Sequence, residues 1–272
     1  MFSKYTRQRK RLYYWQMGDN HPSGFSKNFG DEFSNILAQR LATKKNNIDR
    51  AQGSDLGKIL AVGSILHFAK PFDIVWGSGI NGKAIPDTRR ALNDNNAAYK
   101  MNFLAVRGPL SQKIIHEAGG QCPSIFGDPG FLIGNEDLFP EVSKSLTKKG
   151  TILIPHYFDV KELKKQYDKL DDVKIILPDD CPIKIAQEVA KSEHVISTGL
   201  HGLIFGIALG TPVTHLRLSD HEPDFKFKDM FSGIGSKYPK SCNNLSQALI
   251  NCGHLPSVDS TLDLLNAHPF NN

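Results

Sequence analysis

Cysteine is scarce in this sequence, and long apolar runs are missing from it altogether. The four cysteines are scattered along the chain without C-x-x-C spacing, a pattern that predicts reduced thiols rather than a zinc site or a disulfide framework. No stretch reaches the roughly 18 consecutive apolar residues that span a bilayer. The basic N-terminus lacks the apolar core of a secretory signal. We therefore expect a cytoplasmic protein, and we leave open a peripheral association with the inner face of the cytoplasmic membrane.

A strong excess of positive charge is also missing. The net charge is +5 at pH 7 and the isoelectric point is near 8.9, and no nucleic-acid-binding motif is present. These features argue against nucleic acid as a partner. Basic residues cluster at Lys4–Arg11 and around Lys226–Lys240, which suits an anionic small substrate, an acidic membrane surface or a solvated face without a partner. The oligomeric state is not predicted.

The most informative stretch is residues 194–213, HVISTGLHGLIFGIALGTPV. It predicts a short buried strand at His194–Ser197, a turn, and an apolar helix over Gly202–Leu209. Such a unit directs unpaired backbone N–H groups and the positive end of the helix dipole out of the turn, where they can bind a phosphate or a carboxylate. His201 lies in the turn beside glycines that let a ligand approach the backbone. The alternative is that His201 only caps the helix or packs between strands.

Small or polar residues follow several predicted strands in the first half of the chain, namely Asn28, Ser78, Arg107 and Asp128. Because ligands bind beyond the carboxyl ends of the strands in open parallel sheets, we expect these side chains to face one crevice. Arg107 suits a bidentate grip on a carboxylate or a phosphate. Its alternative role is a structural ion pair with a nearby acid such as Asp128.

Strands alternate with helices in both halves of the chain, which predicts an α/β fold. The pattern restarts at a strand over Thr151–Ile154, after the polar segment Asn135–Lys149, which is the candidate linker. We predict two doubly wound domains that face each other across a cleft. Residues 1–140 form the N-terminal domain, and residues 141–272 form the C-terminal domain with a tail helix near Leu262–Ala267.

Five segments form a recognisable series along the chain. They are Asn28–Glu32 (NFGDE), Val75–Gly79 (VWGSG), Val106–Ser111 (VRGPLS), Gly127–Gly130 (GDPG), and Ile196–Val213 around Leu200-His201-Gly202. In this order and spacing they resemble the polysaccharide pyruvyl transferase family, in particular its bacterial exopolysaccharide or xanthan-type branch. With similar segments in the tail, the resemblance covers nearly the whole chain.

The resemblance implies two Rossmann-like domains in a glycosyltransferase-B-like arrangement, with phosphoenolpyruvate as the donor. The implied acceptor is a pair of hydroxyls on a sugar of a lipid-linked oligosaccharide or glycan, and the product is a cyclic pyruvate ketal on an exopolysaccharide or cell-surface repeat unit. The sequence shows no cluster with metal-ligand spacing, and we expect neither a metal nor a cofactor. In the family, an arginine after the fourth strand and a Leu-His pair hold the donor, and they match Arg107, Leu200 and His201.

One position departs from the other branches of the family, which carry an arginine directly before the Leu-His pair where this chain has Gly199. We infer that Arg217, at the end of the neighbouring strand, supplies the missing charge. Ketal formation also requires a group that gives and takes protons, and His201 is expected to titrate near neutrality and to serve as that acid or base. The central expectation is that the guanidinium of Arg107 and the imidazole of His201 face the same pocket.

The candidate residues fall into three groups. Asp31 or Asp128 could activate the sugar hydroxyl, although helix capping or turn formation gives each of them a structural role. The candidates are His201 and Arg107 for catalysis; Arg107, Leu200, His201, Gly202, Arg217 and His156 for donor binding; and Asn28, Gly30, Asp31, Ser78 and Asp128 for acceptor binding.

Two other functions fit a cleft between two such domains. One is a glycosyltransferase with a nucleotide-sugar donor, although no carboxylate is clearly placed to bind a donor ribose. The other is a non-catalytic module that binds a sugar or an anion.

Overall fold

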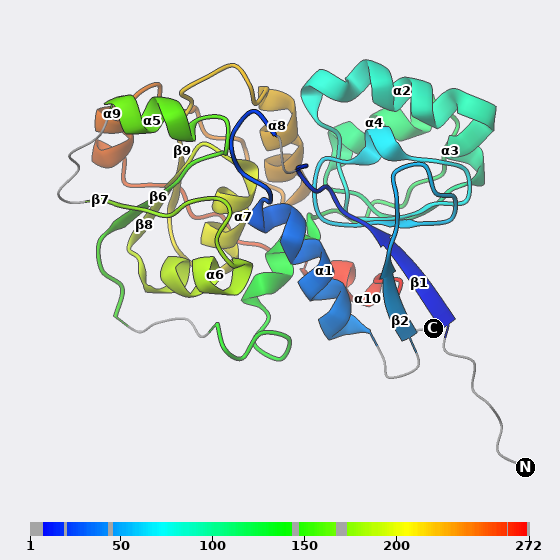
Figure 1. The fold of residues 1–272 in the computed structure, drawn as a ribbon, viewed down its shortest axis with the longest axis horizontal. Helices are drawn as coiled ribbons and strands as arrows, with labels where there is room; N and C mark the ends of the chain where they lie inside the picture. Colours follow the sequence, from blue (N-terminus) through cyan, green and yellow to red (C-terminus); the bar gives the residue numbers. More distant parts are fainter. Residues whose placement is uncertain are drawn as a thin grey trace, which may run out of the picture.

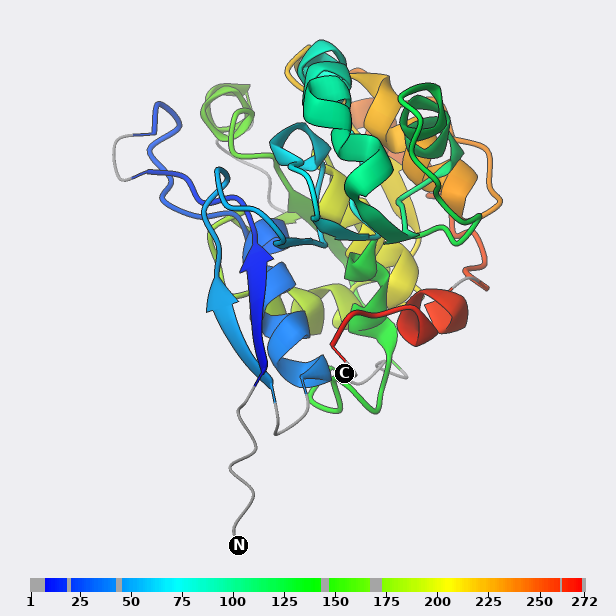
Figure 2. The ribbon, with the colours of Figure 1, turned by 90° about the vertical axis from the view of Figure 1, so that its right-hand side faces the viewer.

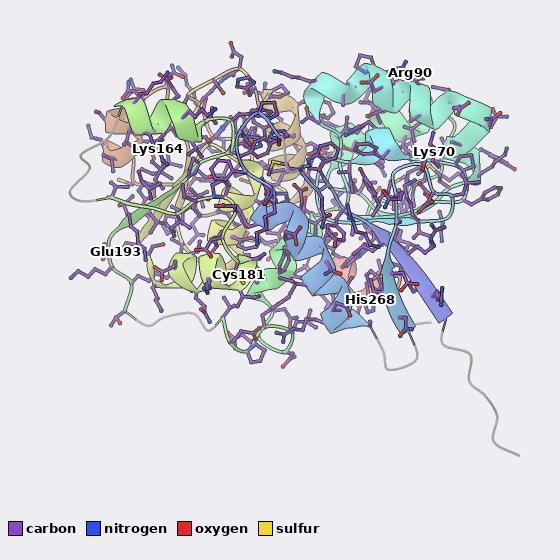
Figure 3. The ribbon with its side chains drawn as sticks, viewed as in Figure 1. Lys70, Arg90, Lys164, Cys181, Glu193 and His268 are labelled. Carbon is purple, nitrogen blue, oxygen red and sulfur yellow. The ribbon has the colours of Figure 1, made fainter. Side chains whose placement is uncertain are left out.

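The computed structural model describes residues 8–18, 21–42, 46–142, 147–166, 173–259 and 261–270, so the basic cluster Lys4–Arg11 lies partly outside the described residues. Within them, strands and helices alternate and form two β-sheets that lie side by side (Figure 1). Charged side chains such as Arg90, Lys164 and Glu193 lie on the outside of both halves, where they remain hydrated (Figure 3).

The first sheet comes from the N-terminal half of the chain, and all of its neighbouring strands are parallel. In spatial order the strands are β2 (Asn46–Arg50), β1 (Gln8–Tyr13), β3 (Ile59–Leu60), β4 (Ile74–Trp76) and β5 (Asn102–Ala105). The helices of this half are α1 (Phe29–Leu41), α2 (Ile85–Asn93), α3 (Ala97–Lys100) and α4 (Pro109–Glu117). Parallel neighbours require crossover connections, and α1 supplies the one between β1 and β2. Figure 1 shows α1 on one side of the sheet and α2 and α4 on the other.

The second sheet is also parallel throughout. In spatial order its strands are β7 (Val173–Ile175), β6 (Thr151–Ile154), β8 (His194–Ser197) and β9 (Val213–His215). The connecting helices are α5 (Val160–Gln166), α6 (Pro182–Lys191) and α7 (Leu200–Ala208). Helix α7 is apolar nearly all round because it packs both on β8 and on the short 3₁₀ helix η4 (Pro129–Gly134).

The C-terminal segment returns to the first half of the molecule. It contains α8 (Asp224–Gly233), α9 (Leu245–Ile250) and α10 (Thr261–Asn266). Helix α8 packs on α4, and the indole Nε1 of Trp76 in β4 donates a hydrogen bond of 2.8 Å to the carbonyl of Leu264 in α10. Figure 2 shows α10, in red, beside η4. Side chains of both sheets and of α8 and α10 belong to one continuous apolar core, so the two halves are packed together and not merely linked.

The predicted fold class is confirmed, since two parallel α/β units face each other with a pocket between them. The strands at Thr151–Ile154 and His194–Ser197 have the predicted bounds. Strand β2 is missing from the prediction because its sequence, NNIDR, lacks the apolar residues that mark a strand. The domain boundary at residue 140 stays a prediction, and α8 and α10, which follow it, contact the first half. None of the helices in the described residues has the length and apolar character that a bilayer crossing requires.

Candidate active site

A pocket of about 240 Å³ lies between the two sheets. The first half lines it with the segment after β1, the start of α1 and the loop after β3. The second half lines it with the ends of β6 and β8 and the starts of α7 and α8. The pocket therefore lies beyond the carboxyl ends of parallel strands from both sheets, where open α/β folds bind their ligands.

The start of α7 forms one wall, through Gly199, Leu200, His201 and Gly202. Gly199 occupies the N-cap position, and no side chain in the described part of the chain caps the helix. Ser197 fixes the turn below it, because its Oγ accepts a hydrogen bond from the backbone N–H of Gly199 and donates one to the carbonyl of Ile154. A Cβ at Gly202 would lie 2.3 Å from that Oγ, so only glycine fits there. The first backbone N–H groups of α7 and its dipole are thus available to an anion in the pocket.

His201 is held by contacts from the first half of the molecule. Its ring packs on Gly30 so closely that a Cβ there would lie 2.0 Å from Nδ1. Its Nε2 lies 3.9 Å from Oδ2 of Asp128, and neither atom has a hydrogen-bond partner among the described residues. Burial, reinforced by the positive charges of Lys226 and Arg107, lowers the pKa of His201 to about 3. The expectation that His201 titrates near neutrality is therefore wrong for the protein without a donor, in which the imidazole is neutral at pH 7.

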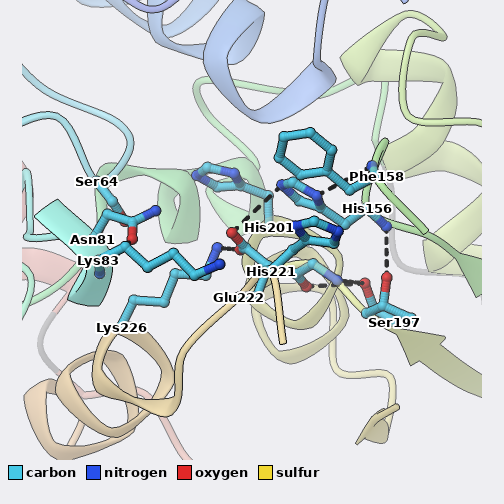
Figure 4. Close-up of polar contacts among 12 residues, drawn as sticks. Ser64, Asn81, Lys83, His156, Phe158, Ser197, His201, His221, Glu222 and Lys226 are labelled. Carbon is cyan, nitrogen blue, oxygen red and sulfur yellow. Dashed lines mark hydrogen bonds and ion pairs between the residues drawn. The ribbon is translucent and has the colours of Figure 1, made fainter. Parts of the chain in front are cut away.

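Lys226 is the cation that lines the pocket. It extends from the first turn of α8 and forms an ion pair with Glu222, which in turn lies 3.8 Å from Nε2 of His156 (Figure 4). Burial and the nearby charge of Arg107 lower the pKa of Lys226 to about 7, although Asp31 and Asp159 act in the opposite direction. Burial likewise holds the pKa of His156 well below its usual value. The cation of this site is thus only partly charged at neutral pH.

Two carboxyl groups complete the electrostatic environment, one on a partly buried residue, Asp31, and one on a fully buried residue, Asp128. Asp31 lines the pocket from the first turn of α1, a helix that the side chain of Asn28 caps by accepting a hydrogen bond from Gly30 N. Burial raises the pKa of Asp31 to about 7, against the opposing effect of Lys226. Burial also raises the pKa of Asp128 to about 6, although a hydrogen bond from Gly130 N opposes it. Both carboxyls therefore exchange protons much closer to neutral pH than an exposed aspartate does.

Arg107 does not reach the pocket, and the expectation that its guanidinium and the His201 imidazole face the same cavity is wrong. Its side chain is fully buried. Nε donates to Oδ2 of Asp229 at 3.1 Å, Nη2 donates to the carbonyl of Ile80 at 2.8 Å, and Nη1 donates to Oγ of Ser64. The structural ion pair that the sequence leaves open is thus present, but its acid is Asp229 rather than Asp128.

The Arg107–Asp229 pair nevertheless acts on the pocket through α8. Asp229 also accepts hydrogen bonds from the backbone N–H and the Oγ of Ser111, at 2.9 and 2.6 Å, so both of its oxygens are bound to the first half. Lys226 precedes Asp229 by three residues, which places both on neighbouring turns of one face of α8. Arg107 is therefore a positioning residue for Lys226.

Arg217 and Ser78 also lie away from the pocket. Arg217 binds Asp220 at 2.8 Å and Asp224 at 3.0 Å in a partly exposed cluster, so the expectation that it supplies the charge missing at Gly199 is not met. Ser78 is fully buried, and its Oγ donates to the carbonyl of Gly63 at 3.0 Å. Its hydroxyl is occupied in joining the segments that follow two neighbouring strands.

The structure thus separates the predicted candidates into two groups. Gly30 and Asp128 contact His201 from behind and position it. Neither of them lines the pocket, and Arg107, Arg217 and Ser78 do not line it either. The candidates that do line it are Asn28, Asp31, His156, Leu200, His201 and Gly202. Glu222 and Lys226, which also line it, are missing from the prediction. Their spacing of four residues indicates an ion pair, but nothing in the sequence indicates that this pair faces the pocket.

No group of three or more His, Cys, Asp or Glu side chains within the described ranges is arranged to hold a metal ion.

Comparisons with known proteins agree with this picture of the chain. A family model described as polysaccharide pyruvyl transferase matches residues 28–220. Uncharacterized protein L143 of Acanthamoeba polyphaga mimivirus is 30% identical over 253 residues, which are 88% of this chain and 83% of that protein. The family match begins at the cap of α1 and ends just before Glu222 and Lys226.

Two solved structures are similar over much of the chain. An uncharacterized protein, KP1_0663 from Klebsiella pneumoniae subsp. pneumoniae NTUH-K2044, aligns with a TM-score of 0.48 and 13% identity over 88% of this chain and 93% of that chain. The wall teichoic acid polymerase TagF aligns with a TM-score of 0.40 and 12% identity over 78% of this chain and 69% of that chain.

The Arg107–Asp229 pair generates a prediction about stability. Asp229→Asn leaves a buried guanidinium without its counter-charge, and we expect the free energy of unfolding to fall by about 3–5 kcal/mol. Urea denaturation measures this loss. The control is Asp220→Asn, which removes an exposed partner of Arg217 and should cost less than about 1 kcal/mol. Equal losses in the two variants would contradict the structural role of the buried pair.

Asp31 generates a prediction about pH. Because its pKa in the folded protein is raised from 3.8 to about 7, the folded state keeps a proton that the unfolded state has already lost, and stability falls as pH rises from about 4 to about 7 and levels off above that. Asp31→Asn removes this dependence. We expect the variant to gain up to a few kcal/mol over the wild type between about pH 4 and pH 8, measured by urea denaturation across the range. Asp137→Asn, at an exposed position, should follow the wild type throughout, and an Asp31→Asn curve parallel to the wild type would contradict the shifted pKa.

Proposed function

The chain belongs to the polysaccharide pyruvyl transferase family, and on that premise we propose that it transfers the pyruvyl group of phosphoenolpyruvate to two hydroxyls of a sugar, releasing phosphate. The proposed product is a cyclic ketal on a sugar of an exopolysaccharide or cell-surface glycan, formed while the glycan is lipid-linked. The observation that supports the proposal best is the convergence, in one pocket, of an uncapped helix N-terminus, a neutral imidazole and a buried ammonium. A lipid-linked acceptor would bring the protein to the inner face of the cytoplasmic membrane.

The proposed donor carries a carboxylate and a phosphate, and the pocket has complementary groups for both. The backbone N–H groups at the start of α7 suit one anionic group. The ammonium of Lys226 suits the other, and it occupies the role that an arginine before the Leu-His pair has in other branches of the family. Once a multiply charged donor binds, its negative charge raises the pKa of Lys226 and of His201, because it favours their protonated forms.

The chemistry requires proton transfer at two places. The methylene carbon of the enol must gain a proton, which makes its neighbouring carbon an oxocarbenium-like centre, and the attacking hydroxyls must lose theirs. His201 is the proposed group that carries protons at the reacting centre, with Asp128 behind it at 3.9 Å. Asp31, whose pKa of about 7 lets it exchange a proton at neutral pH, is the proposed base for an acceptor hydroxyl. No step of this scheme calls for a resident cofactor.

The reaction is tested directly by phosphate release. The protein is incubated with phosphoenolpyruvate and a panel of lipid-linked or simple methyl glycosides, and phosphate and ketal formation are followed. We expect release that depends on both substrates, and we expect phosphoenolpyruvate alone to raise the melting temperature. A melting temperature raised by nucleotide sugars but not by phosphoenolpyruvate would instead support a glycosyltransferase. Binding of glycosides without any phosphate release would support a non-catalytic module.

His201→Ala should abolish turnover while the fold remains intact. Removing a proton-transferring side chain lowers the rate by about 10²–10⁴-fold, which phosphate release in the presence of both substrates measures. The matched control is His116→Ala, at an exposed position on α4, which should keep the wild-type rate. An active His201→Ala enzyme would refute the assignment of proton transfer to this imidazole.

The KM for phosphoenolpyruvate should depend on pH through Lys226. Its pKa is lowered to about 7, so the cation is present below pH 7 and is lost as pH rises, and the KM should increase by up to about tenfold per pH unit above 7. Lys226→Arg, with a side chain that stays protonated, should flatten this profile, and Lys226→Met should raise the KM at every pH.

Lys228→Ala is the control on the same helix, since Lys228 is exposed and pairs with Asp224. Its profile should match the wild type. A wild-type profile that is flat above pH 7, or one that Lys226→Arg leaves unchanged, would rule out Lys226 as the donor-binding cation.

A further inference from the structure

An aromatic pair at the wall of the pocket has no role in the steps proposed so far. Trp15 follows β1 and stacks on Phe68, with ring centroids 5.6 Å apart and planes inclined by 27°. The ring of Phe68 also contacts the rings of Tyr13 and His67, at centroid distances of 4.9 and 4.1 Å. Both Trp15 and Phe68 line the pocket. The two rings therefore form one aromatic surface, supported by the rings of Tyr13 and His67.

The exposure of Trp15 is not explained by packing. Its side chain is 36% exposed, whereas Tyr13 and Tyr14, which precede it, are each 7% exposed. The other tryptophan, Trp76, is fully buried and its Nε1 is hydrogen-bonded. A large indole that is rigidly backed and left open to solvent beside a pocket is a surface suited to a ligand with an apolar face.

The opposite wall also carries aromatic side chains. Tyr157, which follows β6, lines the pocket and lies against His156 at a centroid distance of 4.0 Å. The next residue, Phe158, is 39% exposed and stacks on His221 at 4.7 Å and 23° (Figure 4). Each half of the molecule thus contributes aromatic rings near the pocket, while the charged and titratable groups that suit the donor lie at the helix starts.

We propose that Trp15, supported by Phe68, is the stacking platform for the acceptor sugar, a hexopyranose residue of the glycan. This inference rests on the proposed function. A pyranose ring presents C–H bonds on its faces and hydroxyls at its edge, and the negative face of an indole attracts the slightly positive C–H hydrogens. Stacking on Trp15 would leave the hydroxyls at the ring edge free to reach Asp31 and the donor.

The size of the pocket supports a limited contact with the acceptor. Its volume of about 240 Å³ is below the roughly 300–1,000 Å³ of typical ligand pockets. A pocket this small does not enclose a long glycan, so we expect it to hold the donor and one sugar residue while the remaining sugars extend outside. We expect recognition to depend on the single stacked sugar more than on the length of the glycan.

Intrinsic fluorescence tests the platform independently of catalysis. The chain has only two tryptophans, and Trp76 is buried, so a change on addition of sugar reports on Trp15. The probes are methyl glycosides of glucose, galactose, mannose and their N-acetylated forms, with uridine and cytidine monophosphates as the competing class. At least one glycoside should change the emission of the wild type, and Trp15→Ala should lose this response. A response to the nucleotides and not to the glycosides, or no response to any glycoside, would overturn the proposal.

Kinetics with the glycoside that supports phosphate release give the second test. Trp15→Ala should raise the KM for the acceptor by about tenfold and leave the KM for phosphoenolpyruvate unchanged. Trp15→Phe should restore most of the affinity, and Trp15→Leu, which keeps apolar volume without an aromatic face, should not. Tyr99→Ala removes an aromatic side chain that is 76% exposed elsewhere and should match the wild type.

The outcomes separate the two proposals. An acceptor KM that Trp15→Ala and Trp15→Leu leave unchanged overturns the platform while the pyruvyl transfer stands. Absence of phosphate release with every acceptor overturns the pyruvyl transfer, and the fluorescence titration then still decides whether Trp15 binds a sugar.

Discussion

The buried ion pair between Arg107 and Asp229 is the contact on which the pocket depends. Two charges removed from water are costly unless their hydrogen-bonding capacity is filled. Here the guanidinium also binds Ile80 and Ser64, and the carboxylate also binds Ser111 twice. Glycines allow the close approach that this network needs, since a Cβ at Gly108 would lie 1.9 Å from the carbonyl oxygen of Asp229. The network attaches α8, a helix that follows the second sheet in the chain, to the first half of the molecule, and Lys226 reaches the pocket because of it.

Burial of ionisable groups then determines the charge of the pocket. It shifts acids and bases in opposite directions, so that the pKa values of Asp31 and Lys226 both approach 7 while that of His201 falls to about 3. Each group is thereby moved toward its neutral form. A bound donor with several negative charges would raise the pKa of Lys226 and of His201, because its negative charge favours their protonated forms. In the proposed reaction, binding of such a donor is therefore coupled to uptake of protons by Lys226 and His201.

The sequence predicts those parts of the fold and the site that depend on local signals. The strand, turn and helix around His201 follow from an apolar pattern interrupted by glycines. The amphipathic helix after Asn28 also follows from its pattern, but the sequence points to Asp31 as the capping residue, whereas in the structure Asn28 caps the helix. The sequence places Arg107 after a strand and leaves a structural ion pair open as its alternative role, but it does not identify the acid, because Asp229 is 122 residues away in the chain and no periodicity reports such a contact. Lys226 is not predicted for the same reason. In the sequence it resembles a solvated lysine of a mixed charged segment, and only the long-range contact between Arg107 and Asp229 shows that α8 brings it to the pocket. The sequence does not predict the edge strand β2, because polar residues form it. This segment is a strand because its backbone pairs with β1, and such pairing leaves no apolar pattern in the sequence.

A lysine in this pocket differs in kind from the arginine that other branches of the family carry before the Leu-His pair. Arginine keeps its charge at any working pH, whereas a buried lysine loses it readily. Under the proposed function, the charge that holds the donor is therefore not constant but depends on the groups around Lys226. Glu222 pairs with Lys226 and lies 3.8 Å from His156, so one carboxylate joins the end of β6 to the start of α8. Since β6 belongs to the second sheet and α8 is attached to the first half, a change in how the two halves meet would alter the charge on Lys226 directly. Under the proposed function, a change in the packing between the halves would therefore also change the affinity for an anionic donor.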